Sequence, residues 1–211
     1  MGAREIDLST SFRPYWLLPL ALLLAGVAMS PLDLRIATYF QGNRARWFSE
    51  LLELCEVFGH GGGASLIVIA TIVLGRLELR SWPWLIAGSL GSGVVANLLK
   101  LGISRTRPRD FDLLTGTVWQ TFIRGAGETQ SMQSMPSAHT ATACGLAVVL
   151  TALYPRGGVL FSVLALLVGF QRIATQAHFP SDVFAGAAVG TFVGMGCAKL
   201  LLVSGEHSRR A

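Results

Sequence analysis

Residues 137–175 have the sequence SAHTATACGLAVVLTALYPRGGVLFSVLALLVGFQRIAT, in which a short turn separates two apolar runs. The turn, from Tyr154 to Gly158, holds a proline and two glycines, residues that interrupt helices. A helix needs about 20 apolar residues to cross the hydrocarbon core of a membrane, and each run approaches that length. The stretch therefore predicts a hairpin of two transmembrane helices, over 137–154 and 157–175.

Four further apolar runs surround this hairpin, at residues 15–31, 61–76, 82–101 and 180–203. The run 61–76 is short and needs its flanking residues to complete a span. Arg4 and Arg13 precede the first run, a pattern also typical of a signal peptide, but its length favours a membrane span. The sequence has no alternation of polar and apolar residues of the kind that would indicate a β-barrel. The sequence thus predicts an all-α, polytopic membrane bundle of six transmembrane helices, with residues 1–211 forming one domain.

The composition supports a membrane location. Apolar residues make up 52% of the chain, charged residues only 14%, and the mean hydropathy is +0.54. A soluble domain carries about 25% charged residues, so lipid must solvate part of this surface. The net charge of +5 comes without a basic run, which argues against nucleic acid as a partner. The odd count of three cysteines, at Cys55, Cys144 and Cys197, indicates neither a disulfide framework nor a zinc site.

Arginines in the loops predict the orientation, because basic residues are concentrated on the cytoplasmic side. Residues 1–14, 76–81, 154–157 and 204–211 carry seven arginines in about 32 positions. The loops on the other side, 31–60 and 102–135, carry six in about 64, with Arg107 set aside. Both termini are therefore expected in the cytoplasm and the long loops outside.

The first outer loop contains an amphipathic segment over residues 44–58. One helical face would carry Trp47, Leu51, Cys55 and Phe58, and another would carry Glu50, Glu53 and Glu56. This pattern predicts an interfacial helix lying on the membrane, acting either as a strut or as a guide for substrate.

Three short patterns lie at the outer ends of the predicted spans. Lys100 and Arg107-Pro108 follow the third span, and Pro136-Ser137-Ala138-His139 opens the fourth. Proline suits the first helical position, and the N–H groups of a first helical turn bind anions. Taken alone, the first pattern is also typical of a membrane boundary. The second is also typical of an ordinary helix start.

The third pattern joins the fifth span to the sixth and consists of Arg172, His178, Pro180 and Asp182. A carboxylate in a first helical turn is favourable for the helix dipole alone, so Asp182 also has a purely structural interpretation. The topology brings the three motif loops, 100–109, 136–139 and 172–182, to one membrane face. Three cations there need an anion to balance them, and a phosphate with about two charges suits that need.

Phosphoryl transfer needs charge stabilisation, an in-line nucleophile and a proton for the leaving group. Lys100, Arg107 and Arg172 can supply the charge, with N–H groups around Ser137 and Ala138. A histidine that donates to a carboxylate is oriented and more basic, which predicts His178, held by Asp182, as the nucleophile. His139 would then protonate the leaving oxygen and activate water. Two histidines and one aspartate could also hold a metal ion, but the three cations argue against one.

The order Lys-x6-Arg-Pro, Pro-Ser-Ala-His, Arg-x5-His-x3-Asp resembles the three-part signature of the type 2 phosphatidic acid phosphatase superfamily. The resemblance implies a six-helix membrane enzyme that dephosphorylates lipid phosphates or pyrophosphates through a phosphohistidine, with no metal or other cofactor. It assigns the roles above to Lys100, Arg107, Ser137, His139, Arg172, His178 and Asp182. Two positions depart from the family pattern: Ala138 replaces the usual glycine, and Gln171 replaces a serine.

We expect a location in a bacterial inner membrane. The arginine count in the loops predicts that the active site lies at the periplasmic or extracellular face. Candidate substrates are undecaprenyl pyrophosphate, phosphatidylglycerol phosphate, phosphatidic acid and lipid A, chosen in part by the loop 109–135. The expected partners are such a phospholipid or isoprenoid-lipid phosphate and the membrane lipids; no protein partner is implied. A phosphotransferase using the same phosphohistidine and a non-enzymatic carrier are alternatives, whereas the related vanadium haloperoxidases are soluble.

Two further arginines flank the motif position Arg107. Arg105 and Arg109 add two positive charges to the three that already suit one phosphate. We expect them to be either ordinary interface anchors or ligands of a second phosphate or of an anionic head group.

Overall fold

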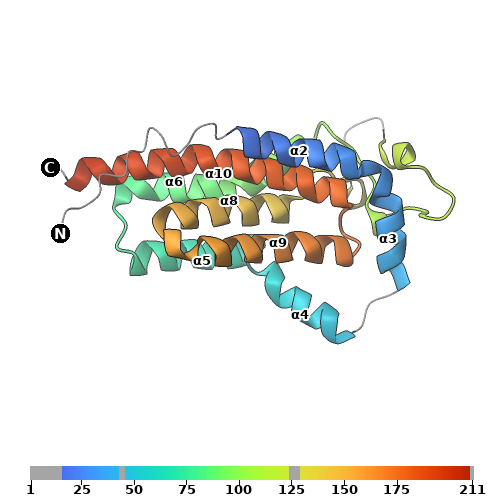
Figure 1. Cartoon of the computed structure of the whole chain (residues 1–211), viewed down its shortest axis with the longest axis horizontal. Helices are drawn as coiled ribbons and strands as arrows, with labels where there is room; N and C mark the ends of the chain where they lie inside the picture. The colour runs from blue at the N-terminus through green and yellow to red at the C-terminus, as the bar shows by residue number, and fades with distance from the viewer. Residues whose placement is uncertain (1–15, 43–45, 124–128, 210–211) are drawn as a thin grey trace.

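The computed structural model describes residues 16–42, 46–123 and 129–209. Every apolar run predicted to span a membrane is helical in it (Figure 1). The helices of these runs are α2 (Leu17–Met29), α5 (Gly61–Leu74), α6 (Trp82–Ile86) with the π-helical turn Ala87–Gly91 and α7 (Ser92–Leu99), α8 (Ala138–Leu153), α9 (Gly158–Ala174) and α10 (Pro180–Arg209). Between residues 16 and 209, outside the gaps, there are isolated bridges at Arg105 but no strand, so the all-α prediction is confirmed.

Within the described residues, four helical segments are long and apolar enough to cross a membrane. They are Leu17–Gly42, Leu79–Leu99, Pro155–Ala174 and Pro180–Ser204. The other two predicted spans, Gly61–Leu74 and Ala138–Leu153, are apolar helices of 14 and 16 residues. At 1.5 Å per residue these reach about 21 and 24 Å, less than the hydrocarbon thickness of about 30 Å. A bundle of several membrane helices is therefore established, while the number six and the single-domain organisation stay predictions.

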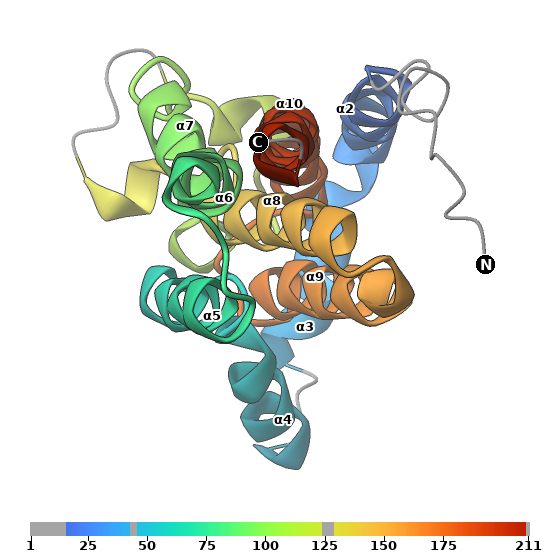
Figure 2. The same cartoon turned by 90° about the vertical axis from the view of Figure 1, so that its left-hand side faces the viewer.

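Helix α8 lies at the centre of the bundle, with α5, α6, α9 and α10 around it (Figure 2). Nine of its sixteen residues are buried, so this helix packs against protein rather than lipid. Small residues allow the close approach: a Cβ on Gly145 would lie 2.2 Å from the Gly88 carbonyl oxygen, and one on Gly190 2.2 Å from that of Ala141. Such contacts between small residues are typical of helices packed within membranes.

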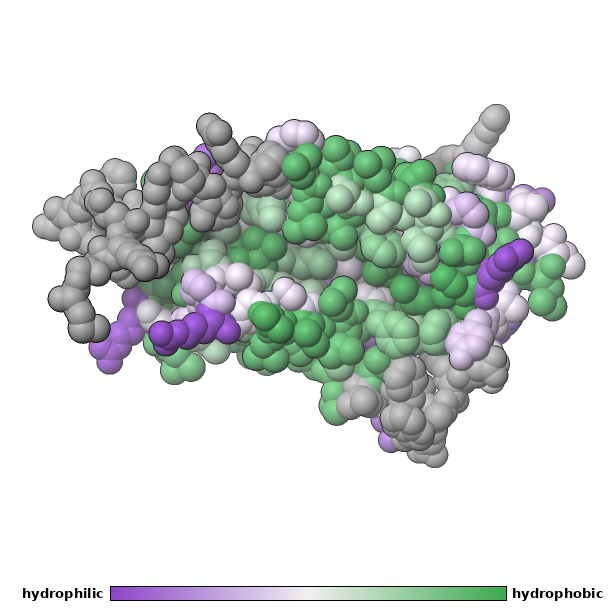
Figure 3. All heavy atoms as spheres, in the orientation of Figure 1, coloured by the Kyte–Doolittle hydropathy of each residue, from purple (hydrophilic) through white to green (hydrophobic). Residues whose placement is uncertain are grey.

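The outer surface of the bundle is apolar along its middle and polar towards its ends (Figure 3). Large apolar side chains face outward there, with Val27 66%, Leu66 69% and Leu166 72% exposed. Exposed apolar area on this scale would be unfavourable in water. The protein is therefore embedded in a membrane by a lipid-facing belt.

The outer loops contain more helix than the sequence predicts. After the 3-10 turn Ser30–Leu32, the chain continues as α3 (Asp33–Gly42), which turns across the end of the bundle where a loop was expected (Figure 1). Helix α4 (Arg46–Glu56) falls within the predicted interfacial helix 44–58 and leaves the bundle obliquely. The remaining connections form single 3-10 turns at Leu79–Ser81, Pro108–Asp110, Val118–Thr121, Gln130–Met132 and Pro155–Gly157.

Candidate active site

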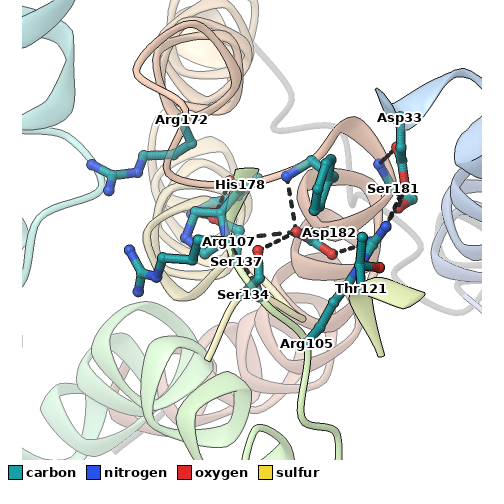
Figure 4. Close-up of polar contacts among 12 residues, drawn as sticks. Asp33, Arg105, Arg107, Thr121, Ser134, Ser137, Arg172, His178, Ser181 and Asp182 are labelled. Carbon is teal, nitrogen blue, oxygen red and sulfur yellow. Dashed lines mark hydrogen bonds and ion pairs between the residues drawn. The ribbon is translucent and has the colours of Figure 1, made fainter. Parts of the chain in front are cut away.

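The predicted site residues come from four helix ends that meet at one end of the bundle. Lys100 caps the carboxyl end of α7, and Arg172 lies in the last turn of α9. Ser137 caps the amino end of α8, and Asp182 lies in the first turn of α10. Arg107 precedes the 3-10 turn Pro108–Asp110, and His178 lies in the link between α9 and α10. Figure 4 shows Arg107, Ser137, Arg172 and His178 in one cluster.

The start of α8 forms the anion-binding part of this cluster. The Ser137 hydroxyl accepts a hydrogen bond from the Thr140 N–H at 3.4 Å and one from the Thr140 hydroxyl at 2.9 Å. These contacts fix the first turn, in which Ala138 and His139 present N–H groups without an intrahelical partner. A helix start of this kind binds phosphate through its N–H groups and its dipole.

Cationic groups surround this helix start and are largely withdrawn from water. Lys100 is 5% exposed, and burial, then the charge of Arg107, lowers its pKa to about 8. The Nε atom of Arg172 is buried without a hydrogen-bond partner, whereas the buried Nε2 of His139 lies 3.2 Å from the Glu56 carboxylate. Buried polar atoms are normally paired, so the unpaired Nε of Arg172 beside a cluster of cations indicates an anion-binding site.

His178 is held as a neutral imidazole. Its Nδ1 lies 2.6 Å from the carbonyl oxygen of Ser134, which can only accept, so Nδ1 carries the proton and Nε2 keeps its lone pair. Burial, followed by the charges of Arg107, Lys100 and Arg172, holds the pKa of His178 well below its usual range. A neutral imidazole with a free Nε2 is the form that can attack phosphorus.

The predicted pairing of His178 with Asp182 needs a correction. The Asp182 carboxylate is 3.9 Å from Nδ1 of His178, beyond hydrogen-bond distance. The direct partner of the imidazole is the Ser134 carbonyl instead. Asp182 Oδ2 accepts bonds from the Ser134 hydroxyl at 2.6 Å and the Phe179 N–H at 2.9 Å. Asp182 therefore contacts the residue that orients His178, rather than His178 itself.

Arg105 was expected to be an interface anchor or a ligand of a second phosphate, and both expectations are wrong. Its side chain is fully buried. Its guanidinium donates to Asp182 at 2.5 Å and to Asp33 at 2.7 Å, and also to the hydroxyls of Ser181 and Thr121 (Figure 4). Protein partners thus accept four hydrogen bonds from this guanidinium. Arg109, by contrast, is half-exposed and lies 3.5 Å from Asp110.

Sequence reasoning also missed the neighbours of Arg172. The carboxylate of Glu56, at the end of α4, accepts a bond from Arg172 Nη1 at 2.6 Å and lies 3.2 Å from Nε2 of His139. Gln171, which was left out of the predicted site, donates to the same carboxylate at 2.9 Å. The spacing of Glu56 indicated only a polar face of the interfacial helix, because its partners are more than a hundred positions away.

No three histidine, cysteine, aspartate or glutamate side chains in the described residues form a group that could hold a metal ion. The side chains of His178 and Asp182, which could have been metal ligands, instead form hydrogen bonds. His178 bonds to the Ser134 carbonyl, and Asp182 bonds to Arg105 and to the Phe179 N–H. Metal independence stays a prediction for the experiment given below.

Curated relatives match part of the chain. A lipid A 1-phosphatase of Rhizobium johnstonii is 36% identical over 104 residues, covering 48% of this chain and 40% of the relative. A lipid A 1-phosphatase of Rhizobium etli is 36% identical over 102 residues, covering 47% and 41%. The chain thus spans about two fifths of the length of these relatives.

Solved structures match the fold more widely. A transmembrane PAP2-type phosphatidylglycerolphosphate phosphatase from Bacillus subtilis has a TM-score of 0.61 at 19% identity, covering 90% of this chain and 96% of that one. LpxE of Aquifex aeolicus has a TM-score of 0.54 at 19% identity, covering 82% and 95%. The sequence model of the PAP2 superfamily matches residues 82–205, which include all three motifs. The chain therefore belongs to the PAP2 superfamily.

Proposed function

We propose that this protein is an integral-membrane phosphatase that hydrolyses a lipid phosphate or pyrophosphate through a phosphohistidine on His178, without a metal ion. The observation that carries the proposal is the combination of a neutral His178 with three cations and the open start of α8 at one place. The unpartnered Nε of Arg172 adds a donor for the same anion. Family membership supports the reaction class.

The proposed reaction has two displacements at phosphorus. Nε2 of His178 attacks, the bond from phosphorus to the lipid oxygen breaks, and His139 gives that oxygen its proton. The negative charge of the bound phosphate favours the protonated form of His139 before this step. Water, deprotonated by His139, then attacks the phosphohistidine, and the phosphorus–nitrogen bond breaks to release inorganic phosphate. Lys100, Arg107, Arg172 and the first N–H groups of α8 stabilise the equatorial oxygens in both displacements.

For the substrate, we propose lipid A as the first of the four candidate lipids to test. The support is the resemblance to lipid A 1-phosphatases over the matched half of the chain. A polar cavity of about 440 Å³ adjoins the site and is lined by Glu53, Glu56, Arg109, Gln171, Arg172, Thr175 and Ala177. Carboxylates, an amide and arginines in that cavity suit a hydroxyl-rich leaving group better than an isoprenoid alcohol.

We further propose that the site faces the outside of a bacterial inner membrane, with both termini in the cytoplasm. The support is the denser set of arginines in the opposite loops. Leu114 is 81% exposed in the loop beside Arg109 and offers a position for a cysteine. In a variant lacking the native cysteines, Leu114→Cys should react with an impermeant thiol reagent in intact cells. Labelling only after the inner membrane is broken would invert this orientation.

Phosphate release by the purified protein tests the proposed activity. Lipid A, phosphatidylglycerol phosphate, phosphatidic acid and undecaprenyl pyrophosphate are supplied in detergent micelles, with and without excess chelator. Inorganic phosphate should appear from at least one lipid at the same rate in both conditions. Activity that is lost in chelator and restored by a divalent ion would contradict the metal-free mechanism. Appearance of a phosphorylated acceptor alcohol in place of phosphate would indicate a phosphotransferase.

The pKa of Lys100 predicts that kcat/KM decreases at alkaline pH. With a pKa of about 8, the ammonium of Lys100 is mostly charged at pH 7 and mostly neutral at pH 9. The ratio kcat/KM reports the free enzyme, so it should fall about tenfold per pH unit above pH 8 as the phosphate site loses a charge. In Lys100→Arg this decrease should be absent, because a guanidinium stays charged. An identical alkaline decrease in both proteins would assign it to another group.

A further inference from the structure

The buried ion cluster around Arg105 lies behind the catalytic loop. Arg105, Asp33 and Asp182 are all fully buried, and Arg105 donates to both carboxylates. Ser181 closes the cluster: its N–H donates to Asp33 at 3.0 Å, and its hydroxyl contacts both Asp33 and Arg105. The guanidinium also stacks against the rings of Phe122 and Phe179, at 4.7 and 4.3 Å from their centroids. Its position is therefore fixed from every side.

Such a cluster is a poor device for stability alone. Removing three charges from water carries a desolvation penalty that ion pairing often does no more than recover, and apolar side chains of similar volume are commonly as stable. A buried, fully hydrogen-bonded cluster instead fixes the positions of the backbone segments that supply its members. The functional residues on those backbone segments therefore indicate the role of the cluster.

Arg105 joins the segments of all three motifs. It lies within the first motif, between Lys100 and Arg107, and binds Asp182 of the third. Its main chain pairs with the segment leading into the second motif, since its N–H donates to Met132 at 2.8 Å and its carbonyl accepts from the Ser134 N–H at 2.9 Å. Ser134 is thus placed by the backbone of Arg105 and by a bond from its own hydroxyl to Asp182.

Ser134 transmits this placement to His178. Its carbonyl accepts the Nδ1 proton of His178, which sets the tautomer and the direction of Nε2. An unbroken series of hydrogen bonds therefore runs from Asp33 through Arg105, Asp182 and Ser134 to His178.

The charges of the cluster suit the same role. With both carboxylates ionised, two carboxylates and one guanidinium leave one net negative charge behind His178. Attack on phosphorus makes the imidazole of His178 cationic, and a fixed negative charge behind it stabilises that form. The proposed phosphate site, by contrast, lies on the other side of His178, towards Arg107 and Arg172 (Figure 4).

We propose that Arg105 and Asp33 are positioning residues for the nucleophile: through Asp182 and Ser134 they hold His178 in the tautomer and orientation needed for attack. The inference rests on the proposed phosphohistidine mechanism. It assigns a catalytic purpose to the helix α3 that follows the first span, since Asp33 opens that helix. It also separates two functions of the site, because the phosphate ligands have no part in this series of bonds.

The test compares Arg105→Lys and Asp33→Asn with the wild-type protein in detergent. The rate of His178 phosphorylation in a single turnover and the inhibition constant for inorganic phosphate are measured per folded molecule. Arg105→Lys keeps the charge, but one ammonium cannot reproduce the forked contacts to Asp33 and Asp182. A small misplacement of a reacting group can cost about 100-fold, and we expect that loss in the phosphorylation rate. Asp33→Asn is isosteric and should lose about tenfold, as for other residues that orient a reacting group.

Competitive inhibition by inorganic phosphate should be unchanged in both variants, because Lys100, Arg107, Arg172 and the start of α8, which would bind it, are untouched. Arg80→Lys is the matched control, since Arg80 makes only an exposed pair with Glu78. An unchanged phosphorylation rate with a lower melting temperature would show a purely structural cluster and overturn the proposal. So would an equal loss of phosphorylation and of binding of inorganic phosphate. If Arg105→Lys does not fold, the isosteric Asp33→Asn decides by the same measurements. Absence of phosphohistidine in the wild-type protein would instead refute the proposed function.

Discussion

His178→Ala should abolish turnover, with kcat reduced by at least about 10⁴-fold, as expected when a covalent nucleophile is removed. The structure gives the reason: His178 is neutral, its Nδ1 proton is fixed on the Ser134 carbonyl, and Nε2 is left as the attacking atom. The variant should remain folded in detergent, because the Asp182 carboxylate keeps its bonds to Arg105 and Ser134. The measurement is steady-state release of phosphate from the best lipid substrate.

Arg80→Lys is the control for this substitution. Arg80 precedes α6 and makes an exposed pair with Glu78. This control should retain the wild-type rate. A His178→Ala protein that still releases phosphate, or that still traps labelled phosphate on another residue, would show that His178 is not the nucleophile.

His139→Ala should lower kcat by about 10² to 10⁴, the contribution of a general acid. The loss should depend on the leaving group, because His139 supplies the proton that a poor leaving oxygen needs. An aryl phosphate with an acidic phenol should therefore lose much less than a lipid phosphate. Comparing kcat for the two substrates in both proteins measures this difference directly.

An equal loss on both substrates would remove the general-acid role and leave His139 as a phosphate ligand only. The nearby carboxylate offers a second comparison. Glu56 lies 3.2 Å from Nε2 of His139 and pairs with Arg172, so Glu56→Gln should weaken the same leaving-group dependence without removing it.

The positions of the helices were largely predictable from the sequence. Spans in lipid need uninterrupted apolar runs, and such runs are visible without tertiary information. The predicted run 157–175 became α9 at Gly158–Ala174, and 137–154 became α8 at Ala138–Leu153. Both short helices still fell at the predicted positions, although their lengths leave the number of spans untested. Helix α3 was missed because its sequence mixes charged, polar and apolar residues, and the contacts of its buried residues Asp33 and Ala37 are to distant segments of the chain.

The partners within the site were not predictable in the same way. Asp182 and His178 are four residues apart, a spacing that suggests contact, yet the carboxylate turned to Arg105, 77 positions away. An arginine near a helix end usually anchors at the membrane surface, and nothing local distinguishes Arg105 from that case. Its burial depends on Asp33, 72 positions earlier, a carboxylate directly after an apolar span. Ionisable residues at such positions are commonly functional, and that was the one available signal.

Rapid quench of the wild-type protein with labelled substrate, in excess chelator, tests the central claim most directly. The account predicts a transient phosphoenzyme that forms within one turnover, is labile in acid, is stable in base and maps to His178 by peptide sequencing. It should form at the same rate with and without the chelator. Phosphate release with no phosphoenzyme, or with the label on a residue other than His178, would contradict the mechanism.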